Sequence, residues 1–198
     1  MTQTEHLKTL FLQRGILSVR DPACRDIPLV CFSRLRAQGY IDRIGHGVYS
    51  CPAHSATEFV TYAEMAAVAP KAVVCLFSAL KIHELTLENP HRIHVALPKG
   101  HRIPKHGLPL EIYHFSGDAY AFGIETRHSP DGDFKVYSVE KTLVDCFKFR
   151  NRIGLDVAIA ALKDAKGKKR LDHAALWQAI RICRMERVMQ PYLESILA

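Results

Sequence analysis

The sequence predicts a mixed α/β (α+β) fold in two parts: a small helical module that ends in a β-hairpin, and a larger domain with a small sheet and C-terminal helices. Two observations lead to this prediction. Three short helical patterns and a glycine-centred hairpin fill the first 50 residues. Alternating strand patterns then run from residue 92 to 137, and amphipathic helical patterns follow them. The segment 51–54 separates the parts, so we expect domains at 1–52 and 53–198.

Bulk composition indicates a globular cytoplasmic protein. The 198 residues are 48% hydrophobic and 24% charged, which is enough to build a core and too balanced for global disorder. No apolar run approaches the roughly 20 residues that span a bilayer, and the N-terminus lacks the pattern of a secretory signal. The six cysteines form no CxxC pair. We therefore expect them to be small buried hydrophobes in a reducing compartment.

The net charge of +7 favours a polyanionic partner, because lysine and arginine gain by releasing counterions from phosphates. A basic surface that only aids solubility is the alternative, and charge alone does not separate the two. The choice between a polyanionic partner and a basic surface for solubility therefore depends on the order of the residues.

The N-terminal module begins with a predicted helix over residues 4–14, which Gly15 closes. An extended link over 16–19 and a short helix over 20–25 follow, with Pro22 tolerated in the first turn of that helix. A third helix is predicted from an N-cap at Asp26, with Pro28 just inside it, to about residue 38.

The third helix presents a small exposed face. At 100° per residue, Leu29, Phe32 and Leu35 form its predicted buried side. The opposite side carries small or hydrogen-bonding residues, which suit a helix that enters the major groove of DNA; these are Val30, Ser33, Arg34 and Ala37, with Gln38 at the edge.

Residues 40–44 and 47–50 alternate apolar and polar side chains around Gly45 and His46, which predicts a hairpin. Three helices followed by a hairpin is the layout of a winged helix-turn-helix DNA-binding domain. We expect base-edge contacts from Arg34, Ser33 and Gln38, and DNA-backbone contacts from Arg43, His46 and Arg20. Arg36 flanks the buried side and is the less favoured reader. Arg34 as an ordinary solvated arginine remains the alternative.

The second part should start with helices over 57–69, capped by Ser55, and 73–85. Strands are predicted at 92–97, 110–115, 122–127 and 134–137. Helices are predicted at 138–150, 155–165, 172–182 and 185–197, the last interrupted by Pro191. A basic turn at 166–170 is either a solvated loop or a nucleic-acid contact.

Catalytic and metal motifs are not supported. His91 and His94 are three apart on a predicted strand, which directs them to opposite faces. Ser138 and Lys141 match the Ser-x-x-Lys motif, but its partner motifs are missing and Ser138 stands where a helix N-cap is needed. Residues 131–133, Asp-Gly-Asp, read as a turn. We therefore expect no enzyme activity, cofactor or metal.

Two stretches resemble AbiEi-type antitoxins of type IV toxin–antitoxin (abortive infection) systems. The first covers residues 32–35 and 39–49, where the family has a leucine-arginine-leucine helix, a glycine, and a hairpin ending in Arg-Gly-Val-Tyr. This chain has His46 at the position of that arginine, which weakens the expected phosphate contact. The second covers residues 137–148, similar to the signature helix of the family's C-terminal domain, and continues through 151–154.

The resemblance implies an antitoxin that also represses its own operon, with two copies binding an inverted repeat of double-stranded operator DNA. The second domain would counteract a nucleotidyltransferase-like toxin, either by direct binding or without a stable complex. The helix at 138–148 and the basic turn supply the candidate antitoxin surface, comprising Lys141, Lys148, Lys168, Lys169 and Arg170.

Two alternatives remain open. One is a plain repressor whose second domain binds a small ligand or dimerises, which a dedicated pocket or a large dimer interface would favour. The other is a nucleic-acid-processing enzyme, which clustered carboxylates with a bound metal would favour.

Overall fold

The computed structural model describes residues 2–103 and 106–197, and its mixed α/β class confirms the predicted fold class. The chain divides into two compact units. The first comprises Met1–Ala72, Arg102–Leu108 and Arg127–Phe134; the second comprises Val73–His101, Pro109–Thr126 and Lys135–Ala198. The first unit therefore continues beyond residue 52, where the sequence predicted the boundary, and takes in two segments from much later in the chain.

The first unit begins with helix α1 (Gln3–Arg14), as predicted. Its start is fixed by a capping box in which Thr2 accepts a hydrogen bond from the Glu5 backbone N–H and the Glu5 carboxylate accepts one from Thr2. Gly15 ends the helix with φ 68°. Strand β1 (Ile16–Ser18) forms from the predicted extended link, and the short helix is a single 3₁₀ turn over Pro22–Cys24.

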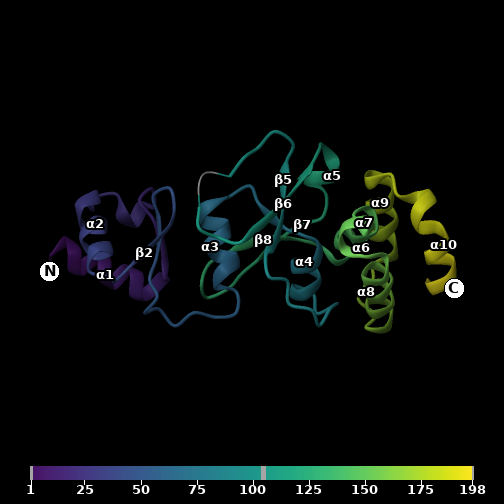
Figure 1. Cartoon of the computed structure of the whole chain (residues 1–198), viewed down its shortest axis with the longest axis horizontal. Coiled ribbons are helices and arrows are strands. Elements are labelled where there is room, and N and C mark those ends of the chain that lie inside the picture. Colours follow the sequence, from purple (N-terminus) through teal and green to yellow (C-terminus); the bar gives the residue numbers. More distant parts are fainter. Residues whose placement is uncertain (1, 104–105, 198) are drawn as a thin grey trace. The chain divides into compact units, whose positions relative to one another are not determined.

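Helix α2 (Leu29–Ala37) is followed by the hairpin of strands β2 (Asp42–Gly45) and β3 (Val48–Ser50). The three strands form an antiparallel sheet in the order β1-β3-β2, and Figure 1 labels β2 together with α1 and α2 of the same unit. This order of helices and strands is compatible with a winged helix, which stays a prediction. The hairpin turn depends on Gly47, which has φ 68°, and a Cβ there would approach the Val19 side chain to 2.8 Å.

Two details of the predicted third helix are wrong. The helix begins at Leu29, with Pro28 in the N-cap position, so Asp26 caps nothing. Leu29 was predicted to be buried but is 64% exposed. The reason is that Ile27 and Cys31 are both buried and join the core beside Phe32. The remaining core residues of this module come from α1, the sheet and the connecting turns, namely Leu7, Phe11, Leu17, Cys24, Leu35, Ile41 and Cys51.

Helix α3 (Val60–Val68) also belongs to the first unit, and Ser55 does not cap it. Instead the Thr57 hydroxyl accepts a hydrogen bond from the Phe59 backbone N–H at 3.1 Å. Thr57 is itself held by Asp131: its backbone N–H and its hydroxyl both donate to the Asp131 carboxylate. Asp131 is 4% exposed, so the Asp-Gly-Asp turn is an anchor between distant parts of the chain.

The larger sheet has the strand order β6-β5-β4-β8-β7. The short strand β4 (Val73–Val74) pairs antiparallel with β5 (Ile93–Pro98) and parallel with β8 (Phe134–Tyr137), while β5 pairs parallel with β6 (Leu110–Phe115). Strand β7 (Ile124–Arg127) completes it. The helix predicted over 73–85 is therefore partly wrong, because its first two residues form β4 and only Leu76–Ile82 are helical, as α4.

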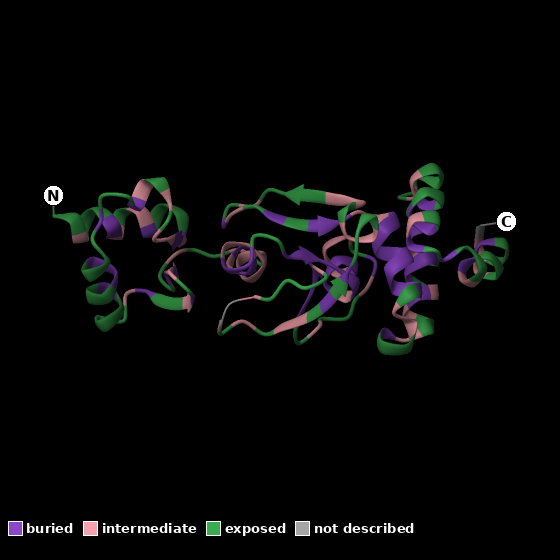
Figure 2. Ribbon diagram, turned by 90° about the horizontal axis from the view of Figure 1, so that it is seen from above, coloured by how far each residue is buried: buried purple, intermediate pink, exposed green. Residues whose placement is uncertain are grey.

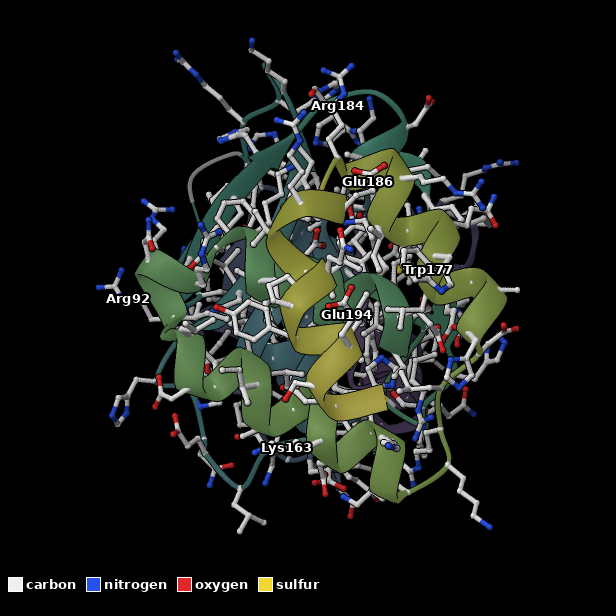
Figure 3. The ribbon with its side chains drawn as sticks, turned by 90° about the vertical axis from the view of Figure 1, so that its right-hand side faces the viewer. Arg92, Lys163, Trp177, Arg184, Glu186 and Glu194 are labelled. Carbon is white, nitrogen blue, oxygen red and sulfur yellow. The ribbon has the colours of Figure 1, made fainter. Side chains whose placement is uncertain are left out.

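The second unit contains the four predicted C-terminal helices in order, together with two short helices, at 118–121 and 150–153, that the sequence did not predict. They are α5 (Asp118–Ala121), α6 (Val139–Lys148), α7 (Arg150–Ile153), α8 (Leu155–Gly167), α9 (His173–Cys183) and α10 (Glu186–Leu197), which contains Pro191. Ser138 caps α6 as predicted, accepting a hydrogen bond from the Lys141 backbone N–H. Helix α6 packs against α4, α8 and α9, and α10 covers α8 and α9 from outside (Figure 3).

In the second unit, buried residues concentrate in the central strands of the larger sheet, β4, β5 and β8, and in the helices beside them (Figure 2). The six cysteines are free and buried, which confirms their predicted place in the cores. Within residues 2–103 and 106–197, no helix has the length and apolar character needed to cross a membrane. Trp177, on the outer side of α9, is 45% exposed (Figure 3).

Candidate nucleic-acid interface

The exposed side of α2 carries the residues predicted to read DNA bases. Ser33, Arg34 and Gln38 are all exposed, as predicted. Val30, at 57% exposed, and Leu29 extend this surface toward the start of the helix with apolar side chains. Apolar groups at that place suit contact with thymine methyl groups, while hydroxyl, amide and guanidinium groups suit hydrogen bonds to base edges.

Two arginines border this exposed side. Residues 34 and 36 are two apart, so on an α-helix they are separated by about 160° of the circumference on the solvent side. Between them lie small side chains, Ser33 and Ala37, with Val30 a turn earlier. Leu29 and Val30 occupy the start of the same exposed strip, so the helix backbone can approach the floor of a DNA groove most closely around Ser33 and Ala37.

The Arg36 edge of α2 opens onto a groove in the first unit. The groove has a volume of about 660 Å³ and is open to solvent along one side. Its walls are α2, strand β2, the β2–β3 turn and a later segment of the chain; the lining residues are Arg36, Arg43, Ile44, Gly45, His46, His106 and Gly107. Two guanidinium groups and two imidazoles therefore line it, with no carboxylate among the lining residues.

Two hydrogen bonds fix the shape of this groove, one from a side chain and one between backbone groups. The Arg43 Nε donates to the Gly45 carbonyl oxygen at 3.0 Å, within a register shift between β2 and β3. The Gly107 N–H donates to the Ile44 carbonyl oxygen at 3.3 Å, which attaches the later segment to the outer edge of β2. Arg43 therefore helps to shape the groove that it lines, while the later segment is held to β2 by a main-chain bond.

The structure brings together some predicted DNA-contacting residues and separates others. Arg36, Arg43 and His46 share the groove, whereas Arg20 is exposed after β1 and does not line it. The sequence made Arg36 the least favoured of the predicted DNA-contacting residues, yet its side chain lines the groove. His106 was missed, because its place depends on a tertiary contact of Gly107 with β2 that no local pattern encodes.

Lys141 was predicted on the antitoxin surface, and that prediction is wrong. It is fully buried and its ammonium group forms an ion pair with Asp145, one turn along α6. Its Nζ also lies over the rings of Tyr137 and Phe115, 4.2 and 4.6 Å from their centroids. The amphipathic pattern of the helix did not reveal this, because α6 is covered on nearly every side.

The basic turn is tied to the end of α4. The Lys168 Nζ donates to the Glu84 carbonyl oxygen at 2.6 Å and to the Asp164 carboxylate at 2.7 Å. Arg170 donates to the His83 carbonyl oxygen at 2.8 Å and pairs with the Glu84 carboxylate at 3.0 Å. Lys148 and Lys169 are exposed. Of the predicted antitoxin residues, these two are the most available to a partner.

A second groove, of about 650 Å³, lies in the second unit between residues 84–88 and α8. Carboxylates dominate its charged lining, with Glu84, Glu88, Asp156 and Asp164 against Lys168 alone. Among the described residues, no three histidine, cysteine or carboxylate side chains are grouped so that they could hold a metal ion. This groove differs in charge from the one beside α2.

Comparison of the chain with protein-family models gave no match, and comparison with curated proteins gave none either.

Proposed function

We propose that this protein is a cytoplasmic DNA-binding autoregulator and the antitoxin of an AbiEi-type system. The observation that carries the DNA-binding half is the strip on α2 between Arg34 and Arg36, next to a groove that Arg36 shares with Arg43. An exposed strip with a hydroxyl group and apolar side chains, bordered by guanidinium groups, matches a DNA groove that presents base edges and thymine methyl groups between phosphates.

The roles of the individual residues follow from their chemistry. Arg34 presents a planar guanidinium that bonds in two places to the edge of a guanine, while Ser33 and Gln38 bond adjacent bases. Arg36 and Arg43 hold the phosphate backbone, with His46 beside them at the turn. Two copies would bind one inverted repeat, because the symmetry of a palindromic site mirrors that of a protein dimer.

The antitoxin half of the proposal rests on the resemblance of residues 137–154 to the family's C-terminal domain. The proposed target is a nucleotidyltransferase-like toxin encoded beside this gene. Lys148 and Lys169 are the exposed basic residues through which the second unit would act. Lys141 is buried in the core of that unit, so we expect its substitution to impair protection from the toxin only by destabilising the fold.

One assay in cells tests autoregulation and antitoxin activity separately. The region upstream of the gene drives a reporter, and the neighbouring toxin gene is expressed in the same cells. We expect Arg34→Ala to lose repression and keep protection from the toxin. The double variant Lys148→Ala/Lys169→Ala should keep repression and lose protection. Arg187→Ala, an exposed arginine on α10, is the matched control and should keep both activities.

Two outcomes would contradict the proposal. Unchanged reporter output with and without the protein would remove the autoregulator half. Full repression without any protection from the toxin would remove the antitoxin half and favour the plain repressor.

A further inference from the structure

Residues 106–108 stand beside the proposed DNA-binding residues although they come from a distant part of the sequence. The Gly107 N–H donates to the Ile44 carbonyl oxygen of β2, and His106 lines the same groove as Arg36 and Arg43. The segment therefore adds a side chain to a surface whose other described lining residues, apart from Gly107, come from the first 50 residues.

One hydrogen bond fixes the tautomer of the His106 ring. The Leu108 backbone N–H donates to the His106 Nδ1 at 3.2 Å. A ring nitrogen that accepts a hydrogen bond carries no proton, so in the neutral imidazole the proton is on Nε2. Nε2 is thus a donor, and within the described part of the chain it has no hydrogen-bond partner. His106 is half-buried, and its ring is held by the bond to Leu108.

Among the described residues that line the groove, the charged and polar side chains are hydrogen-bond donors and none is acidic. Each guanidinium group has five N–H donors, of which the Arg43 Nε–H is taken by the Gly45 carbonyl oxygen, and the His106 Nε2–H adds a neutral donor to the rest. The ligand that matches such a set is a phosphate diester, which has only acceptors and a negative charge. A continuous DNA backbone also suits an open groove, because the strand has to enter and leave it.

We propose that residues 106–108 form a third DNA-contacting element, in which the His106 Nε2–H donates to a backbone phosphate that Arg36 and Arg43 hold in the groove. This inference rests on the proposed DNA binding and extends it to a contact outside the N-terminal module. The contact carries no sequence information, since every nucleotide offers the same phosphate.

The test uses two variants of His106 that keep different atoms of the ring. His106→Asn places an amide oxygen near the position of Nδ1, so it keeps the acceptor for Leu108 and removes the distal donor. His106→Gln places an amide N–H near the position of Nε2, so it keeps the donor. His91→Asn, at an exposed histidine in the second unit, is the matched control.

Binding of the full chain is measured by fluorescence anisotropy on two 30-base-pair duplexes, one from the region upstream of the gene and one of scrambled sequence. We expect His106→Asn to weaken binding to both duplexes by about tenfold, the size of effect that a hydrogen bond to a charged group has. His106→Gln should stay within about threefold of the wild type. The slope of log affinity against log salt should not change, because a neutral donor displaces no counterion.

The results distinguish this inference from the proposed function. If Arg34→Ala loses preference for the upstream duplex while His106→Asn binds like the wild type, the third element is refuted and the DNA-binding proposal stands. Equal weakening by His106→Asn and His106→Gln would overturn the assignment to Nε2. If the wild type binds neither duplex, both proposals fail. Thermal melting of each variant confirms that the fold is intact before binding is compared.

Discussion

Lys141 and Asp145 form an ion pair one turn apart on α6, and neither side chain is exposed to solvent. The rings of Tyr137 and Phe115 flank the ammonium group. Burial raises the pKa of the Asp145 carboxyl to about 6, and the neighbouring Lys141 opposes that rise. The pair is a structural element of the second unit, and each charge depends on the other.

Removing one partner should therefore destabilise the protein strongly. We expect Lys141→Met to lower the free energy of unfolding by about 3–5 kcal/mol, because it leaves a carboxylate buried without its counter-charge. The double variant Lys141→Met/Asp145→Leu should lose less than Lys141→Met alone. Urea unfolding measures both. Lys148→Met, at an exposed lysine of the same helix, should change stability by less than about 0.5 kcal/mol; equal losses from Lys141→Met and Lys148→Met would contradict this account.

Asp131 should matter more than its neighbour in the same turn. Its carboxylate accepts two hydrogen bonds from Thr57 at the start of the α3 segment, whereas Asp133 pairs with His128 and is 58% exposed. We expect Asp131→Ala to cost about 1–3 kcal/mol, since two donors lose a buried partner. Asp133→Ala should cost less than about 1 kcal/mol. Equal costs in urea unfolding would show that the turn is not an anchor.

Protonation of His94 should lower the free energy of unfolding in mild acid. Burial lowers its pKa below the ordinary value of 6.5, and Glu111, with 3.6 Å between its Oε2 and the His94 Nε2, only partly offsets that. The unfolded chain thus binds the proton more tightly than the folded protein. Stability is therefore lost as pH falls from above 6.5 toward the lowered pKa.

The measurement is urea unfolding at pH 7.5 and pH 5.5. His94→Phe keeps the ring contacts with Phe77 and Tyr113 and removes the titrating group. We expect the variant to lose less stability between the two pH values than the wild type does. Asp145 titrates in both proteins, so its contribution cancels in the comparison. Identical pH dependence would show that His94 does not govern this loss.

Arg36 should act on DNA affinity without acting on sequence preference. It lines the groove and is assigned to a phosphate. We expect Arg36→Gln to weaken binding to upstream and scrambled duplexes by the same factor, and to reduce the salt slope by about 1. Anisotropy titrations at several salt concentrations measure both quantities. A loss confined to the upstream duplex would make Arg36 a base reader instead.

Local patterns predicted the elements whose signals are local. Helix α1 has apolar residues at helical spacing and a glycine at its end, and the apolar segments that form β6 and β8 are bounded by turn residues, so these were predicted almost to the residue. The prediction of a single helix over 73–85 was partly wrong because a short apolar run fits a buried strand and a buried helix equally well. Pairing with β5 and β8 on either side makes Val73 and Val74 a strand.

The errors in the site have a different origin. Leu29, Lys141 and His106 were misjudged or missed because their surroundings come from distant parts of the chain. Leu29 is exposed since Ile27 and Cys31 fill the core, and Lys141 is buried since aromatic rings and Asp145 accommodate its charge. His106 reaches the groove through the contact of Gly107 with Ile44. Periodicity on one segment contains none of this information.

The most direct test of the central claim is the ratio of affinities for upstream and scrambled DNA, measured for the wild type and for Arg34→Ala at the same salt concentrations. The account predicts that the wild type prefers the upstream duplex by at least about 1,000-fold, and that Arg34→Ala loses roughly tenfold or more of that preference. Equal binding of the wild type to both duplexes would contradict it, and attention would move to the second unit and a protein or RNA partner.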